Sequence, residues 1–475
     1  MQQQNTRSAL LHHSSAIFLI RFFPSLANLL VILYFSKRLS LEAYGQYQHI
    51  WAQYYILTAV ALAGLPAFAL TVGFPSFIAF VKSWPAARKW LLVGWPVLWS
   101  VVFAVLQLAG VLSFPLSFCF LLSAVAGMAL EGLLLAGRRF QPLLALNMVY
   151  TVFFLWLHYV FFSGQYSLSW LFTCLTVLGM VRVVCMLPFF FKKMKADDLP
   201  TEKGNAGKSA GGLWLHLGFF ELSQVVFRWA DKFIVSLFLS AGALAIYYNG
   251  SLEIPFLPLL IGAAGSALLL HMHAPGNVDS LARKNELVYA SGVVLSSLVL
   301  PLFFFLLFFA QPLFRLALSE KYLSALPVFW VMLLVLPLRA YNFVTLLQHL
   351  QKGAVINAGV LLDVVLALGL CYPLYQIMGL PGIALSFVTG TYAQAGFYLY
   401  HLSRLTRLRI HKILPLQNWL LKLLVLAFLF AGLRFFLART AAAWLTLLYG
   451  GIGLVVSCLL LLLLDFRFLK RFKKV

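Results

Sequence analysis

Polar and charged side chains that recur inside one long apolar stretch are the residues of this sequence best suited to do chemistry. They are Glu221, Gln224, Arg228, Asp231 and Lys232. On a helix, residues at these spacings line one face about 100° wide. A charge at the centre of a membrane-spanning helix costs roughly 2.5–3.5 kcal/mol and commonly marks a functional site. The pattern therefore predicts a face that lines a cavity, or alternatively an internal stripe of salt bridges.

Four other apolar stretches carry polar residues of the same kind. They contribute Arg21, Asn28, Glu253, Arg339, Asn342 and Asp363. We interpret four basic residues as cations that line a cavity: Arg21, Arg228, Lys232 and Arg339. Guanidinium groups form paired hydrogen bonds with phosphate oxygens, so an anionic ligand suits them. Arg21 lies near the start of its stretch, where a side chain can instead reach the membrane surface.

The remaining polar residues are interpreted as cavity lining or counter-ions. They are Asn28, Glu221, Gln224, Asp231, Glu253, Asn342 and Asp363. Two of these, Glu253 and Asp363, are mid-span acids that either balance the arginines or bind a coupling ion, Na⁺ or H⁺. The five cysteines form no C-x-x-C pair, and His271 and His273 do not share a helix face. We expect no catalytic residue, no metal site and no cofactor.

Other charged and aromatic residues have simpler interpretations. Glu131 is expected to pair locally with Arg138 or Arg139. Three basic residues near span ends are expected to extend to the membrane surface: Arg182, Lys422 and Arg434. Three aromatic residues are expected to anchor at the interface, or alternatively to stack on sugars: Trp51, Tyr54 and Tyr55.

The elements that must position these residues are membrane-spanning helices. The 475 residues are 63% hydrophobic and only 10% charged, whereas soluble domains are nearer half apolar and a quarter charged. This composition excludes a soluble enzyme. About 20 apolar residues cross a bilayer, and fourteen stretches qualify: 14–36, 50–73, 90–112, 115–137, 143–163, 168–191, 210–238, 243–272, 287–310, 325–349, 355–375, 380–402, 415–437 and 441–464.

The distribution of Lys and Arg predicts the topology. Most of the 35 basic residues fall in connections on the side that also holds both termini, and basic loops are cytoplasmic. We expect a multi-pass protein of the cytoplasmic membrane with both termini in the cytoplasm. The net charge of +22 then reflects topology and contact with membrane lipids, so no nucleic-acid partner is expected.

A weak internal repeat divides the chain. A shift of 200 residues aligns Leu39-Ser40 with Leu239-Ser240 and Tyr47 with Tyr247 without a gap, together with other small and apolar identities. The polar segment 192–209 separates the halves. We expect an N-terminal six-helix bundle (1–191), a cytoplasmic linker (192–209), a C-terminal six-helix bundle (210–402), and two additional helices with a basic tail (403–475).

Two short motifs carry a resemblance to a known family. Residues 39–47, LSLEAYGQY, and residues 231–247, which begin Asp231-Lys232 and end Ile246-Tyr247, resemble junctions of polysaccharide transporters. These are the O-antigen, or lipid-linked oligosaccharide, flippases of the multidrug/oligosaccharidyl-lipid/polysaccharide exporter (MOP) superfamily. Ala245 departs from the pattern, where glycine is usual. The region 357–402 resembles the family's hairpin of helices 11 and 12.

The resemblance implies a fold and a function. The fold would be an all-α membrane protein of about 14 helices. Two six-helix bundles would form a V with pseudo-twofold symmetry, and two helices would follow. The function would be alternating-access flipping of a polyprenyl-pyrophosphate-linked oligosaccharide for cell-surface polysaccharide biosynthesis, with Arg21 and Arg228 at the diphosphate. Glycosyltransferases or a polymerase of the same pathway would be partners.

Two alternatives to a flippase are weighed. One is a cation- or proton-coupled exporter of drugs from the same superfamily, which predicts an acidic cavity. The other, more distant, is a membrane-embedded glycan polymerase or ligase, which usually carries a large outer loop. No outer loop of this chain is long enough, and the longest lies near 311–324. We therefore expect a transporter and not an enzyme.

Overall fold

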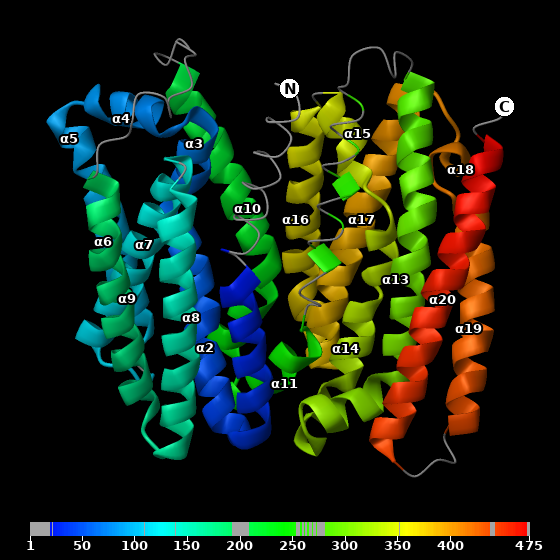
Figure 1. Ribbon diagram of the computed structural model, residues 1–475, viewed down its shortest axis with the longest axis horizontal. Helices are drawn as coiled ribbons and strands as arrows, with labels where there is room; N and C mark the ends of the chain where they lie inside the picture. Colours follow the sequence, from blue (N-terminus) through cyan, green and yellow to red (C-terminus); the bar gives the residue numbers. More distant parts are fainter. Residues whose placement is uncertain are drawn as a thin grey trace. The chain divides into compact units, whose positions relative to one another are not determined.

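The chain folds as two helical units. The computed structural model describes residues 20–191, 209–252, 281–437 and 442–472, except residues 21, 109, 138 and 351, together with a few positions between 257 and 272. Contacts divide the chain into unit 1, Met1–Leu244, and unit 2, Ala245–Val475. Every regular element in these described segments is a helix, which confirms the predicted all-α class (Figure 1).

The described residues of unit 1 form a helix over residues 22–38 and nine further helices. These are α2 (Leu41–Leu62), α3 (Leu65–Val72), α4 (Phe74–Lys82), α5 (Ala86–Lys89), α6 (Leu91–Leu106), α7 (Phe114–Ala136), α8 (Phe140–Ser163), α9 (Leu168–Phe191) and α10 (Ser209–Phe238). The next helix, α11 (Ala241–Gly250), crosses into unit 2.

Unit 2 contains the remaining described elements. They are α13 (Leu281–Ala317), η2 (Glu320–Ala325), α14 (Leu326–Leu333), η3 (Leu336–Ala340), α15 (Phe343–His349), α16 (Gly353–Met378), α17 (Leu380–Thr406), α18 (Ile410–Ile413), α19 (Leu416–Leu437) and α20 (Ala443–Phe472). Helix α13 packs against α19 and α20, and α16 packs along α17 (Figure 1).

Most predicted spans coincide with long helices. Among the described residues, eight helices are long and apolar enough to cross a membrane, or nine if the bent pair α2 and α3 counts as one span. The chain is therefore a multi-pass membrane protein, and the count of fourteen spans stays a prediction. Short helices α4 and α5 occupy a segment that was expected to be a plain connection.

Two predicted spans differ from the structure at identifiable breaks. The expected span 50–73 starts earlier, at Leu41, and bends by 45° between α2 and α3. Ala63 and Gly64 adopt left-handed conformations there (φ 47° and 71°). The expected single helix 325–349 is wrong, because it is divided into α14, η3 and α15. Pro337 in the first turn of η3 cannot donate a backbone hydrogen bond, which explains the interruption.

The internal repeat is visible in helix capping. The Oγ of Ser40 accepts a hydrogen bond from the Ala43 amide at 3.2 Å, which caps α2. The Oγ of Ser240 accepts the equivalent bond from the Ala243 amide, also at 3.2 Å, before α11. Such caps stabilise a helix start because the first amides lack partners within the helix. The same serine cap thus occurs at two helix starts that lie 200 residues apart in the sequence.

The boundary between the units lies after the predicted linker. Helix α10, which the sequence assigns to the second bundle, packs on α2 and α3 within unit 1. Beyond the end of α10, Gly45 of α2 permits close approach of the first residue of α11, since a Cβ there would lie 1.8 Å from the Ala241 carbonyl oxygen. Near the start of α10, the Trp214 indole donates a hydrogen bond to the Ala63 carbonyl oxygen at 2.9 Å.

Candidate functional site

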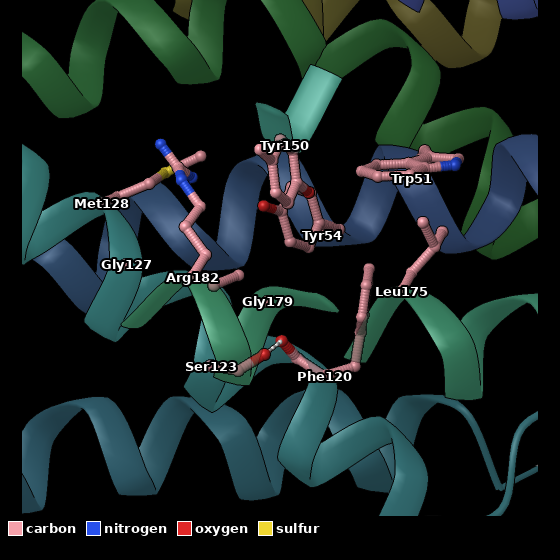
Figure 2. A pocket seen from close by; sticks show the side chains of 11 residues that line it. Trp51, Tyr54, Phe120, Ser123, Gly127, Met128, Tyr150, Leu175, Gly179 and Arg182 are labelled. Atoms are coloured by element: carbon pink, nitrogen blue, oxygen red, sulfur yellow. Dashed lines mark hydrogen bonds between the residues drawn. The ribbon is translucent and has the colours of Figure 1, made fainter. Parts of the chain in front are cut away.

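A pocket inside unit 1 is lined by four helices, α2, α7, α8 and α9. Its lining is Trp51, Tyr54, Phe120, Ser123, Ala124, Gly127, Met128, Tyr150, Leu175, Gly179 and Arg182. The empty space measures about 430 Å³, including the part open to the surroundings. Figure 2 shows Arg182 and Met128 at one end of the lining and Trp51 and Leu175 at the other, with Tyr54 and Tyr150 between them. Four of these eleven lining residues are therefore aromatic, and one, Arg182, is cationic.

Arg182 is held in this pocket by three helices. Its guanidinium forms an ion pair with Glu131 of α7 and donates to the Oδ1 of Asn147 on α8 at 2.8 Å. It also lies 4.8 Å from the ring centroid of Tyr150. The predictions that Arg182 reaches the membrane surface and that Glu131 pairs with Arg138 or Arg139 are wrong. Arg182 faces inward because α7 and α9 pack side by side and bring it to Glu131.

The depth of Arg182 was a usable sequence signal. It lies nine residues before the last residue of α9, Phe191. That separation is roughly 13 Å along a helix, at about 1.5 Å per residue. A lysine or arginine that far from a span end does not easily reach the membrane surface, so its position indicates a partner inside the bundle.

The aromatic residues of α2 form the interior of unit 1. Trp51 and Tyr54 are only 8% and 7% exposed, and their ring centroids lie 5.0 Å apart. The Tyr54 ring centroid lies 5.2 Å from that of Phe120. The expectation that Trp51 and Tyr54 anchor at the membrane interface is therefore wrong, because the face of α2 that carries them is turned into the bundle.

The predicted polar face of α10 is divided in the structure. Asp231 and Lys232 are buried and form an ion pair at 3.3 Å, and the Lys232 Nζ lies 5.6 Å from the Trp229 ring centroid. Glu221 and Arg228 are exposed. The ammonium of Lys232 is thus already neutralised by its sequence neighbour. The side chain of Gln224 lies outside the described residues.

The polar residues predicted around helix 1 are only partly described. Asn28 donates a hydrogen bond to the Tyr55 hydroxyl at 2.6 Å, and the Tyr55 ring stacks on Trp229 of α10 with centroids 4.2 Å apart. Asn28 therefore belongs to the contact between helix 22–38, α2 and α10. Arg21 lies outside the described residues, as does Glu253.

The interrupted segment of unit 2 carries two of the predicted residues. Arg339 is exposed at the end of η3. Asn342 precedes α15, and its Nδ2 is buried without a hydrogen-bond partner among the described residues. Interrupted helices in transporters commonly form ligand sites, because their free backbone groups and side chains can turn toward a cavity.

Asp363 of α16 is the most unusual predicted residue. It is 0% exposed, and both carboxyl oxygens lack a hydrogen-bond partner in the described part of the chain. A Cβ at Gly390 of α17 would lie 2.3 Å from the Oδ1 of Asp363, so the α17 backbone covers the carboxyl group. Arg339 lies within range of electrostatic interaction. A buried ionised carboxylate without hydrogen bonds is very costly, so this arrangement suits the protonated acid.

A second buried charge cluster was missed by the sequence reasoning. Lys422 of α19 is 4% exposed and donates to the Oδ2 of Asp465 at 2.7 Å and to the Ser296 hydroxyl at 2.7 Å. It also donates to Ser297 and to the Val293 carbonyl. The expectation that Lys422 reaches the membrane surface is wrong. Asp465, an acid directly after the predicted stretch 441–464 and within α20 in the structure, was the overlooked signal for an internal pair.

Neither unit offers a metal site in the segments that the structure describes, where no group of three or more His, Cys, Asp or Glu side chains could hold an ion. The polar groups are instead a paired arginine in an aromatic pocket, an exposed arginine on α10, an exposed arginine on η3 and an orphaned carboxyl on α16.

Comparison with known proteins defines the class of fold. No family model and no curated protein matches the chain. The solved structure of the lipid II flippase MurJ, in an inward closed conformation, has a TM-score of 0.57 and 14% identity. This match covers 94% of this chain and 98% of the other.

Two multidrug-type transporters also match. One is an inward-facing multidrug resistance transporter of the MATE family of the MOP superfamily, with a TM-score of 0.58 and 13% identity over 83% of this chain and 99% of the other. The other is the eukaryotic MATE transporter AtDTX14, with a TM-score of 0.48 and 14% identity over 87% and 95%. The chain therefore has the fold of MOP-superfamily transporters, as predicted. The two structures with TM-scores above 0.5 are a flippase and a multidrug transporter.

Proposed function

We propose that the chain is a flippase that moves a polyprenyl-pyrophosphate-linked oligosaccharide across the cytoplasmic membrane by alternating access, for cell-surface polysaccharides such as O-antigen. The observation that carries the proposal is the extent of the fold match. The flippase structure covers 94% of this chain, whereas the multidrug transporter covers 83%. Glycosyltransferases or a polymerase of the same pathway are the proposed partners.

We assign contact with the pyrophosphate to arginines that the structure leaves exposed. Arg228 on α10 and Arg339 on η3 are both exposed, whereas Lys232 is buried against Asp231. Guanidinium groups suit a diphosphate because they form paired, charge-assisted hydrogen bonds. Arg21 is assigned the same role from the sequence, and Lys232 is assigned a supporting role.

Conversion of Arg228 or Arg339 to Gln tests this assignment. Each change removes the positive charge but keeps a polar, although shorter, side chain that can still donate hydrogen bonds. We expect export of the lipid-linked glycan to fall at least about tenfold, since one charge-assisted bond contributes roughly 1.5–3 kcal/mol. Complementation of a flippase-deficient strain and flipping in liposomes measure the effect.

The control for these variants is Arg315→Gln. Arg315 is also exposed, and it pairs with Glu320 near the end of α13. All variants are compared at equal amounts in the membrane. Full activity of both the Arg228 and the Arg339 variants would contradict the assignment.

We further propose that transport is coupled to H⁺ or Na⁺ at Asp363. Its carboxyl group is buried without a hydrogen-bond partner in the described part of the chain, so an ionised Asp363 would have to take up a proton or a cation to be buried in this way. Asp363→Asn should fold normally, because the amide mimics the protonated acid, and should abolish the dependence of flipping on an ion gradient. Flipping in liposomes with an H⁺ or a Na⁺ gradient measures this, and an unchanged gradient dependence would contradict it.

The alternative function is ion-coupled export of small drugs. It is favoured by the equally high TM-score of the multidrug transporter, 0.58. The mixed charges of the predicted site argue against it, since cationic drugs require an acidic site. Drug susceptibility of cells that overproduce the protein separates the two functions, because a flippase leaves it unchanged.

A further inference from the structure

The pocket of unit 1 is chemically unlike the exposed arginines assigned to the pyrophosphate. Its only cation, Arg182, is already paired with Glu131 and hydrogen-bonded to Asn147. A second negative charge in the pocket would lie close to the Glu131 carboxylate. The pocket therefore disfavours a phosphate group and favours a ligand without net charge.

An unpaired donor in the lining indicates a ligand with oxygen acceptors. The Nε of Arg182 is buried and has no hydrogen-bond partner among the described residues. The Trp51 indole nitrogen also lacks one, but it lies at the end of its ring farthest from Tyr54 and Arg182 (Figure 2). A buried N–H group without an acceptor costs roughly 1–3 kcal/mol. A purely apolar ligand such as a lipid tail would leave this cost unrelieved, so the occupant should carry hydroxyl or carbonyl oxygens.

The aromatic rings indicate that the ligand also has apolar faces. Trp51, Tyr54, Phe120 and Tyr150 contribute rings to the lining (Figure 2). Binding pockets commonly combine such apolar walls with a few polar groups that fix orientation. Glycine at position 127 leaves the wall open, since a Cβ there would make only ordinary contacts, the nearest at 3.7 Å, whereas a Cβ at Gly179 would lie 3.1 Å from the Ser123 hydroxyl oxygen.

A pyranose ring combines these properties. It is uncharged, its C–H faces can lie on aromatic rings, and its hydroxyl groups accept hydrogen bonds at the rim. We propose that the pocket between α2, α7, α8 and α9 is a saccharide subsite that holds one sugar ring of the translocated glycan. This inference rests on the proposed flippase function and extends it, because it separates recognition of the sugar from recognition of the pyrophosphate.

Direct binding of free sugars tests the subsite without any translocation. Purified full-length protein in lipid nanodiscs is titrated with glucose, galactose, rhamnose and N-acetylglucosamine, with acyclic sorbitol as the control probe. Binding is followed by saturation-transfer-difference NMR. We expect at least one pyranose to bind and sorbitol not to bind.

Two pairs of variants locate the binding. Gly127→Leu fills the pocket, and its control Gly94→Leu lies on an exposed face of α6 with nothing within 4 Å of the added Cβ. Tyr54→Leu removes a lining ring, and its control Tyr159→Leu removes an exposed ring from α8. The pocket variants should weaken binding at least about tenfold, while both controls bind like the wild type.

The outcomes separate this inference from the proposed function. Absence of pyranose binding to the wild type, or unchanged binding in both pocket variants, overturns the subsite. Binding that only the pocket variants lose supports it. Flipping of a lipid-linked glycan is measured in the same preparations. Its absence in the wild type would overturn the flippase proposal, while the sugar titration would still decide whether the pocket binds saccharides.

Discussion

At the scale of single residues, two buried charge pairs in the described segments join different helices. Arg182 and Glu131 join α9 to α7, and Lys422 and Asp465 join α19 to α20. Two serines and a carbonyl group of α13 complete the ammonium's hydrogen bonds. Such a pair is costly to break from one side but need not stabilise the fold relative to well-packed apolar residues.

A double-mutant cycle on Lys422 and Asp465 tests this view. Lys422→Met leaves a buried carboxylate without its cation, and Asp465→Leu leaves a buried ammonium without its anion. Each single change should lower the free energy of unfolding by about 3–5 kcal/mol, and the double variant should recover most of the loss. Thermal unfolding in detergent measures the cycle, and single variants that melt like the wild type would refute a structural ion pair.

At the scale of elements, close packing between helices depends on particular small residues. α2 meets the start of α11 at Gly45, where a Cβ would lie 1.8 Å from the Ala241 carbonyl oxygen. This contact explains why glycine stands in the stretch Ala43-Tyr44-Gly45-Gln46-Tyr47. The neighbouring Gly242 is less constrained, since its Cβ would lie 3.7 Å from the Oε2 of Glu42.

Gly45→Ala should therefore be far more damaging than Gly242→Ala, although both add one methyl group beside the same junction. Relief of the overlap requires the backbone around Ala241 to move, and overpacking of this kind typically costs about 1–3 kcal/mol. Thermal unfolding and the yield of monodisperse protein measure the difference. Equal stability of the two variants would show that α2 and α11 do not pack this closely.

The sequence predicted elements better than it predicted side-chain partners. α7, α8, α9 and α16 lie within a few residues of their expected stretches, because about 20 consecutive apolar residues leave few other structures in a bilayer. Arg182 and Lys422 were misplaced, since their partners come from other helices and no local spacing reveals them. The break at Pro337 was visible in the sequence but was masked by continuous hydrophobicity.

At the scale of the whole molecule, the repeat and the compact units do not share a boundary. The repeat places the division near 192–209, whereas contacts place it after Leu244. Helix α10 accounts for the difference, because it packs with α2 and α3 although it follows the linker. The second half of the sequence thus contributes a helix to the first unit.

The topology prediction also belongs to this scale. Single cysteines placed in a variant that lacks native cysteines should react with an impermeant maleimide from the cytoplasmic side at position 203 and after Val475. A cysteine at Lys321 should react from the outer side. The expectation follows from the cytoplasmic location of basic connections. Labelling of all positions from the same side would show that the assumed number of intervening spans is wrong.

The packing of α10 within unit 1 has a consequence for biosynthesis. The ribosome completes the first six predicted spans before it makes Trp214, whose indole later binds the carbonyl of Ala63 at the bend between α2 and α3. Until then the Ala63 carbonyl lacks the Trp214 indole, and Gly64 lacks the α10 backbone at Gly218 that packs against it. The amino-terminal unit therefore cannot mature as soon as it is synthesised, and its assembly must wait for the first helix of the following half.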